Sequence, residues 1–271
     1  MLSDNSGDDI LLTMELNRIN TVKLMLAKHS EIFLCLLISI SILEYDFQLH
    51  ASDDHALRLL QGGKSCRQCN LAGSDLRDKF LPGAILTKAV ISNSNLKNIN
   101  LKRAQLHGAD LSFSDIRAAN LKDANLSGAS LKGADLADAF LMGIILEDAD
   151  LSGTNLERAY LLDADLEKAD LTGACMRKAR FIRANLDKTC LKASDLSMAD
   201  LSEASLVKAD LSGANLGGAD FIRADLREAN LAGAFLTHDK KPADFTGANL
   251  QGTIWLNGIP CKKGSFGKCI Q

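Results

Sequence analysis

The chain has 271 residues, with 31 Lys and Arg against 34 Asp and Glu, and 46% of it is hydrophobic while only 5% is aromatic. The near balance of charge excludes a polybasic nucleic-acid-binding protein and an acidic tail, and the abundance of Leu and Ala excludes a disordered chain. So few aromatic residues are unusual for an enzyme of this size, because enzymes normally use more of them to fill a core.

Residues 1–51 have the pattern of a secretory signal. An uncharged run of 12 residues, IFLCLLISISIL, spans residues 32–43, and two lysines precede it. This run is short for a membrane-spanning helix but typical of the hydrophobic part of a signal peptide. Ala51 offers a small residue for cleavage, and the pattern fits better if translation starts at Met25. We expect export to the periplasm or the exterior of a bacterium, with a membrane anchor formed by residues 32–43 as the alternative.

Residues 52–68 are expected to form a capping helix and an entry loop. The stretch SDDHALRLL at residues 52–60 begins with capping residues, carries acids in its first turn and is followed by two glycines, which is typical of a short helix. Such a helix would cover the first coil of the repeat that follows, because an uncovered end exposes strand edges.

A repeat of five residues occupies most of the chain. Every fifth residue from Leu71 to Leu236 is large and apolar, and the residue two places earlier is small, except at Lys79, Ile99 and Ile144. A period of five fits neither an α-helix nor a flat strand. It fits a chain that bends in the same sense after each short strand. Four units then close a square coil of 20 residues with the apolar side chains inside, and the coils stack about 4.8 Å apart.

The unit, A-(D/N)-L-x-x, resembles that of the pentapeptide-repeat family over about residues 69–258. The resemblance implies an all-β fold, a right-handed parallel quadrilateral β-helix, to which we add the short N-terminal capping helix. We call the large apolar residue of each unit its apolar centre. The period shifts once, because the apolar centre after Leu236 is Phe245, four residues later than the period of five predicts. This shift predicts a loop at 237–242. Residues 259–271 are expected to cap the far end, with the apolar side chains of Leu256, Ile259, Phe266 and Ile270 over the last coil.

The cysteines suggest local disulfides rather than a metal site. Cys66 and Cys69 lie at the start of the repeat, and Cys261 and Cys269 lie at its end. A zinc site that combines the two pairs would have to join opposite ends of the stack. In an oxidising compartment one disulfide at each end is the simpler interpretation, and free thiols are expected if the protein is cytosolic. Cys175 and Cys190 fall on different faces and should not pair with each other.

No pattern typical of a catalytic, cofactor-binding or metal site occurs in the sequence. The five histidines form neither H-x-x-x-H nor H-E-x-x-H, and no phosphate-binding glycine motif or nucleophile elbow is present. The frequent Asp and Asn recur at one outward position of the unit, where solvation and turn hydrogen bonds are their ordinary roles. We therefore expect no catalytic residue, no cofactor and no metal.

Two surface features appear when residues 20 apart are stacked. One is a column of acids, interrupted by Lys132 and Lys192, of the kind that could imitate nucleic-acid phosphates: Asp110, Asp150, Asp170 and Asp210. The other is a group of apolar residues at outward positions of three successive coils, a candidate protein-binding patch: Phe140, Met142, Tyr160, Leu162 and Ile182. Contiguous exposed apolar side chains normally mark an interaction site, although packing at the corners could instead hide some of them.

These features favour a non-enzymatic, exported scaffold that binds a protein through the faces of the β-helix. The partner's identity stays open, and a homodimer is one option. Neither direct nucleic-acid binding nor stable membrane insertion after signal cleavage is expected. The alternative is a cytosolic DNA mimic that binds a topoisomerase, gyrase, and protects it from quinolones, as the resemblance implies for some family members. Removal of residues 1–51 would leave 28 bases and 27 acids, and this near neutrality argues against mimicry.

Overall fold

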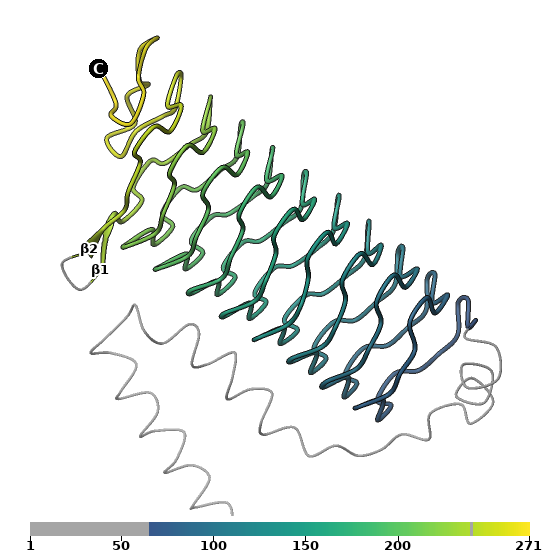
Figure 1. The fold of residues 1–271 in the computed structure, drawn as a ribbon. Helices are drawn as coiled ribbons and strands as arrows, with labels where there is room; N and C mark the ends of the chain where they lie inside the picture. Colours follow the sequence, from purple (N-terminus) through teal and green to yellow (C-terminus); the bar gives the residue numbers. More distant parts are fainter. Residues whose placement is uncertain (1–64, 239–240) are drawn as a thin grey trace, which may run out of the picture. The chain divides into compact units, whose positions relative to one another are not determined.

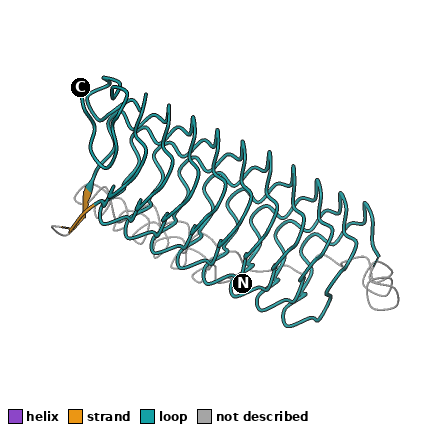
Figure 2. Ribbon diagram, turned by 45° about the horizontal axis from the view of Figure 1, so that its top comes forward, coloured by secondary structure: helices purple, strands orange, loops and turns teal. Residues whose placement is uncertain are grey.

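A computed structural model describes residues 65–238 and 241–271. Within these ranges the chain winds into a right-handed, four-sided parallel β-helix (Figures 1 and 2). Single parallel bridges join residues 20 apart from one coil to the next. We name the four sides by the first residue of each bridged column: face A starts at Asn70, face B at Asp75, face C at Phe80 and face D at Ser65.

The turn that follows each apolar centre generates the square coil. The amide of Ser74 donates to the carbonyl of Leu71 at 3.1 Å, and Gly73 between them has φ +70. Every fifth residue from Gln68 to Gly233 likewise has a positive φ, whether or not it is glycine. A positive φ at the third position of a four-residue turn is the signature of a type II turn. One turn type therefore bends the chain at all four corners.

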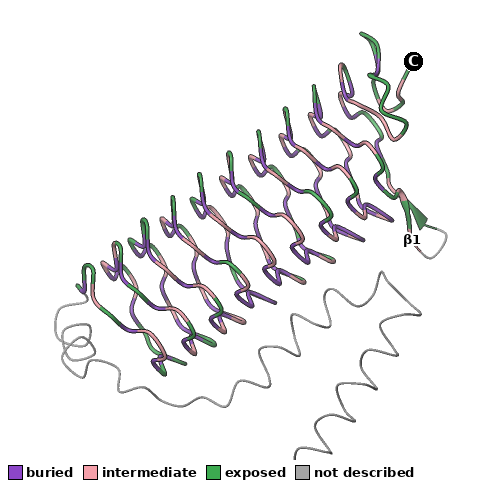
Figure 3. Ribbon diagram, turned by 180° about the vertical axis from the view of Figure 1, so that it is seen from behind, coloured by how far each residue is buried: buried purple, intermediate pink, exposed green. Residues whose placement is uncertain are grey.

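The interior is a continuous apolar column that runs through the coils. The apolar centres from Leu71 to Leu231 are buried, and Leu236 is partly buried. The small residues beside them are buried too, and Figure 3 shows buried positions recurring around every coil. Near the far end the Phe221 and Phe245 rings stack with their centroids 4.9 Å apart. The core is therefore filled without any contribution from the outward positions.

A hairpin interrupts the coil within the predicted loop at 237–242. Strand β1 (Thr237–His238) pairs antiparallel with β2 (Lys241–Pro242), and the four extra residues change the bridge spacing from 20 to 24, as at Asp220 and Asp244. The hairpin packs closely on face B. A Cβ at Gly217 would overlap the backbone nitrogen of His238 and would lie 2.5 Å from the carbonyl carbon of Thr237.

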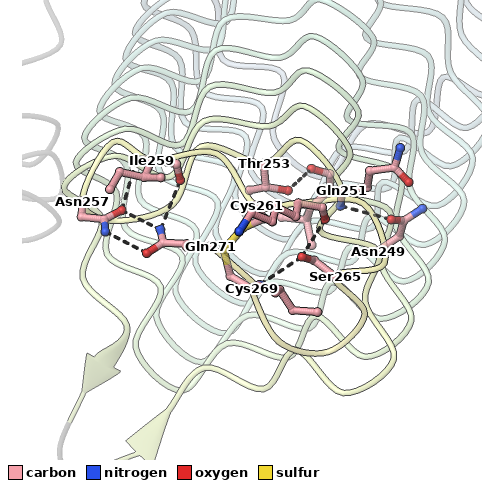
Figure 4. Close-up of a disulfide and its surroundings, with 12 residues drawn as sticks. Asn249, Gln251, Thr253, Asn257, Ile259, Cys261, Ser265, Cys269 and Gln271 are labelled. Carbon is pink, nitrogen blue, oxygen red and sulfur yellow. Dashed lines mark hydrogen bonds between the residues drawn. A yellow bond between two sulfur atoms is a disulfide. The ribbon is translucent and has the colours of Figure 1, made fainter.

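The far end is closed by a chain reversal rather than by another coil. Residues 249 and 254 form antiparallel bridges to Phe266 and Pro260, respectively, and Cys261, which is disulfide-bonded to Cys269, is buried over the last coil (Figure 4). Leu256 is partly buried against the core. The expected burial of Ile259, Phe266 and Ile270 there is wrong, because these side chains are 49–62% exposed. The disulfide, Trp255 and Phe245 fill the space above the core that these three were expected to fill.

The signal-like segment, with its 12-residue run, and the expected capping helix at residues 52–60 lie outside the described residues. Residues 65–238 and 241–271 contain no helix, so none there is long and apolar enough to cross a bilayer.

Substitution of an apolar centre in the middle of the stack tests the prediction that these side chains point into the core. Leu166 is fully buried, so Leu166→Asp would bury an unpaired carboxylate at a cost of several kcal/mol and should strongly lower the melting temperature followed by circular dichroism. Lys178→Asp, a change at an exposed turn position, should melt within about 2 °C of the parent. A parent-like melt of Leu166→Asp would contradict the assignment.

The hairpin gives a second test. Ala occupies the position equivalent to Gly217 in other units, at Ala137 and Ala232, so the turn itself accepts a Cβ. Gly217→Ala should therefore act only by displacing the hairpin, and amide hydrogen exchange over Thr237–Pro242 should become faster. Ser197→Ala, at the same position one coil earlier, is the matched control. Unchanged exchange in Gly217→Ala would show that the hairpin does not depend on this contact.

Candidate protein-binding surface

An aromatic ladder projects from the middle of face C. Phe140, Tyr160 and Arg180 are bridged in succession on adjacent coils. The Phe140 and Tyr160 rings are stacked, with centroids 5.4 Å apart and planes 8° from parallel. The guanidinium carbon of Arg180 lies 5.9 Å from the centroid of the Tyr160 ring. Stacking and the cation–π contact hold the exposed rings in one orientation, so a partner would meet them with little loss of side-chain entropy.

The aliphatic members of the patch stand beside this ladder. Met142, Leu162 and Ile182 each occupy the first turn position after an apolar centre, on three successive coils. Their backbones are linked from coil to coil through the neighbouring residue: the amide of Gly143 donates to Leu162 at 2.9 Å, and that of Asp163 donates to Ile182 at 3.0 Å. The structure thus brings all five predicted residues together on face C. We call Phe140, Met142, Tyr160, Leu162 and Ile182 the apolar patch.

The apolar patch is accessible to a partner. Phe140 is 43% exposed, and the other four side chains are partly exposed. None of the five belongs to the buried core, so packing at the corners does not hide them completely. The patch therefore leaves apolar surface exposed on the monomer, although folding of the coil does not require apolar side chains at these positions.

An ion pair borders the patch beside Leu162 and Ile182. Arg183 binds the carboxylate of Asp163, one coil below, with its Nη2 2.7 Å from Oδ2. Hydrogen bonding to this guanidinium holds the pKa of Asp163 below its ordinary value. Exposed pairs of this kind contribute little to stability, but this one fixes a charged edge next to Leu162.

The acid column of face A has a structural explanation. The carboxylates of Asp150 and Asp170 each accept a hydrogen bond from the backbone amide two residues later, at 2.9 Å, and Asp110 and Asp210 do the same at 3.0 Å. Lys192 also lies 3.2 Å from Asp210. These acids support their own turns, as Asx residues do, and a base neutralises part of the column.

The cysteine pairs lie at the two ends of the coil. Cys66 is bonded to Cys69 and Cys261 to Cys269, while Cys190 is a free thiol and so is not paired with Cys175. Because the pairs are separated by the whole stack, they cannot form one zinc site. Within the described part of the chain, no cluster of three or more His, Cys, Asp or Glu side chains could hold a metal ion.

Two features of this surface were not predicted from the sequence. One is the placement of Arg180 over Tyr160, although the 20-residue column already set the two residues on adjacent coils. The other is the left-handed turn residue, for which the signal was the frequent glycine two places after the apolar centre, as at Gly133, Gly153 and Gly173. Asp, Asn, Lys and Arg share that position and obscured the pattern.

Comparison with known proteins agrees with this architecture. The family model for pentapeptide repeats matches eight copies between residues 65 and 238. HetL, a pentapeptide repeat protein involved in heterocyst differentiation regulation in the cyanobacterium Nostoc sp. strain PCC 7120, is 34% identical over 78% of this chain and all of its own, with a TM-score of 0.30.

Two further solved structures are similar to this chain. A trypsin-treated form of QnrB1, a plasmid-mediated fluoroquinolone resistance protein, is 23% identical over 76% of this chain and 89% of its own, with a TM-score of 0.48. A pentapeptide repeat protein from the thylakoid lumen of Arabidopsis thaliana is 28% identical over 45% of this chain and 68% of its own, with a TM-score of 0.19. No curated protein matches the chain.

Proposed function

The chain belongs to the pentapeptide repeat family, and we propose that it is a non-enzymatic scaffold that binds a protein through face C of its β-helix. The apolar patch is the observation that carries this proposal. Polar and charged side chains occupy most outward positions of the coil, whereas five apolar ones are adjacent here. Their burial by a partner could contribute several kcal/mol, at about 25 cal/mol per Å² of apolar surface.

The arrangement of the patch also suits recognition of a protein rather than of a small ligand. Its members stand on a ladder of coils that is rigid from one bridge to the next, and the rings of Phe140 and Tyr160 are already stacked. Preorganised aromatic side chains bordered by charge are typical of the centre and rim of protein interfaces.

The alternative, a cytosolic DNA mimic that binds gyrase, fits the charges less well. Phosphate mimicry needs a sustained negative potential along one face. In the described coils, bases pair with acids on adjacent coils: Arg158 with Asp138 on face B, and Lys188 with Glu167 on face D. Together with the paired acids of faces A and C, this leaves no face uniformly negative.

Removal of two central side chains tests the patch. Tyr160→Ser combined with Leu162→Ser removes the middle of the patch without touching the core, so folding should stay nearly unchanged while association is lost. The measurement is chemical crosslinking of the full chain in extracts of its native cells, together with light scattering of the purified protein.

The matched control is Phe113→Ser, which removes an exposed aromatic ring from face A and should leave every complex in place. If the Tyr160 and Leu162 variant forms the same complexes as the parent, face C is not the binding surface. A loss of complexes with the Phe113 variant as well would point to a general effect on the coil.

We also propose that the protein works after export. The apolar run at residues 32–43 is of signal-peptide length, and disulfides such as Cys66–Cys69 and Cys261–Cys269 persist in oxidising compartments. Export would separate the protein from cytoplasmic topoisomerases and so favours the scaffold over the DNA mimic.

Mass spectrometry of the protein from its native cells tests export. We expect a mature N-terminus near Ser52, after cleavage at Ala51, and a peptide map under non-reducing conditions that contains Cys261 linked to Cys269. A protein that retains residues 1–51 and carries free thiols at both positions would contradict export and favour the cytosolic alternative.

A further inference from the structure

The chain reversal at the far end of the stack exposes three large apolar side chains. Their exposed fractions are 50% for Ile259, 62% for Phe266 and 49% for Ile270. The core beneath is closed without them, because Cys261 and Ser265 are the side chains of the reversal that are buried. Single exposed apolar residues are ordinary, but three in one short segment normally mark a binding surface.

Backbone contacts hold these residues in one layer over the last coil. The amide of Trp255 donates to the carbonyl of Ile259 at 3.0 Å, and the amide of Lys262 donates to the carbonyl of Ile270 at 2.7 Å. The side-chain amide of Gln271, the neighbour of Ile270, donates to the carbonyl of Ile259 at 3.3 Å (Figure 4). The two isoleucines and the lysine therefore lie close together at this end.

The layer is also braced internally. The Cys261–Cys269 disulfide crosslinks it, and the amide of Ile270 donates to the hydroxyl of Ser265 at 3.0 Å. Phe266 is bridged to Asn249 of the last coil. A ligand would thus meet apolar side chains on a fixed backbone, which lowers the entropy lost on binding.

The same segment is basic. Lys262, Lys263 and Lys268 are exposed, and residues 245–271 contain no Asp or Glu. None of the three lysines forms an ion pair with a described residue. The last acid before them, Asp244, lies on face C, where its carboxylate accepts hydrogen bonds from the amide and the hydroxyl of Thr246 at 2.8 and 2.6 Å. The positive charge at the end of the stack is therefore not neutralised locally.

We propose that this end of the stack docks on the surface of a membrane that contains anionic lipids. We call the residues that would make the contact the basic cap: Ile259, Lys262, Lys263, Phe266, Lys268 and Ile270. The lysines would bind headgroup phosphates, and the apolar side chains would enter the boundary between headgroups and acyl chains. Such docking needs no membrane-spanning segment. This role goes beyond the proposed function, because it leaves face C free to bind a protein.

The size of the basic cap favours a membrane over a protein as its ligand. At about 200 Å² for a large side chain, the three exposed apolar side chains offer only about 300 Å². A stable protein interface takes about 800 Å² from each partner. An anionic lipid surface needs less contact area, because each lysine near it strengthens binding about fivefold by electrostatic attraction alone.

Trp255 provides a local probe of docking. It is the only tryptophan of the chain, its amide bonds to Ile259, and its ring packs edge-on against Phe245. The full chain is mixed with phosphatidylcholine vesicles that contain about one-third phosphatidylglycerol and a phosphatidylcholine with a nitroxide on its headgroup. The nitroxide should quench Trp255 fluorescence in these vesicles, but not in vesicles without phosphatidylglycerol. Contact of residues 32–43 with the bilayer cannot give this signal, because they contain no tryptophan.

Two variants separate the contributions of charge and of apolar contact. Lys262→Gln with Lys263→Gln and Lys268→Gln should raise the lipid concentration for half-maximal quenching about a hundredfold, at about fivefold for each lysine. Phe266→Ser with Ile270→Ser should raise it about tenfold, because less apolar surface leaves water. Both variants leave the disulfide and the buried side chains intact, so their melting temperatures should stay close to that of the parent.

The matched control is Lys79→Gln with Lys88→Gln and Lys97→Gln, which removes three exposed lysines from the first coils and makes the same change in net charge. It should bind the vesicles like the parent. An equal loss of quenching in this control would show attraction by overall charge and would overturn the proposal.

Two other results would also overturn it. One is quenching of the parent that is absent, or that does not depend on phosphatidylglycerol. The other is self-association of the parent that Phe266→Ser with Ile270→Ser abolishes, which would assign the end of the stack to a second copy. The variant Tyr160→Ser with Leu162→Ser should still dock, so a failure of the basic cap and a failure of the face C proposal are distinguishable.

Discussion

The coil depends on one backbone conformation, the left-handed residue near the end of every turn. At Gln68, Asp78 and Lys88 this conformation is adopted by residues with a Cβ, at a cost of about 1–2 kcal/mol each. The cost is offset because the same residue donates its amide to the next coil, as Gln68 does to Thr87 at 2.9 Å and Asp78 does to Lys97 at 3.0 Å. Bending and stacking are therefore produced by the same residue, and the coil grows without long strands.

This regularity separates the inside of the coil from its outside almost completely. Two of the five positions in each unit fill the core, and the other three face solvent and serve the turns. A carboxylate before the apolar centre can hold the amide two residues later, as Asp150 does for Ser152, but the turn does not require it. Phe140, Tyr160 and Arg180 replace that carboxylate at the same position and leave the coil unchanged. The outer positions are thus free to carry a binding surface.

The sequence predicts those parts of the structure that follow from the repeat. The period of five, the small residue two places earlier and the four-residue shift before Phe245 are enough to place the core, the coils and the interruption. The columns of residues spaced 20 apart in the sequence also place the apolar patch. The orientation of the side chains within a column depends on their local contacts, so the placement of the Arg180 guanidinium over the Tyr160 ring required the structure.

The end of the coil shows where such prediction stops. Ile259, Phe266 and Ile270 have the hydrophobicity of a cap, but no period assigns them to the inside. The antiparallel return of the chain sets Cys261 and Ser265 over the core, where the amide of Leu250 donates to Ser265 at 2.8 Å. Hydrophobicity alone could not distinguish this arrangement from the expected one, because backbone hydrogen bonding at the open edge decides which residues turn inward.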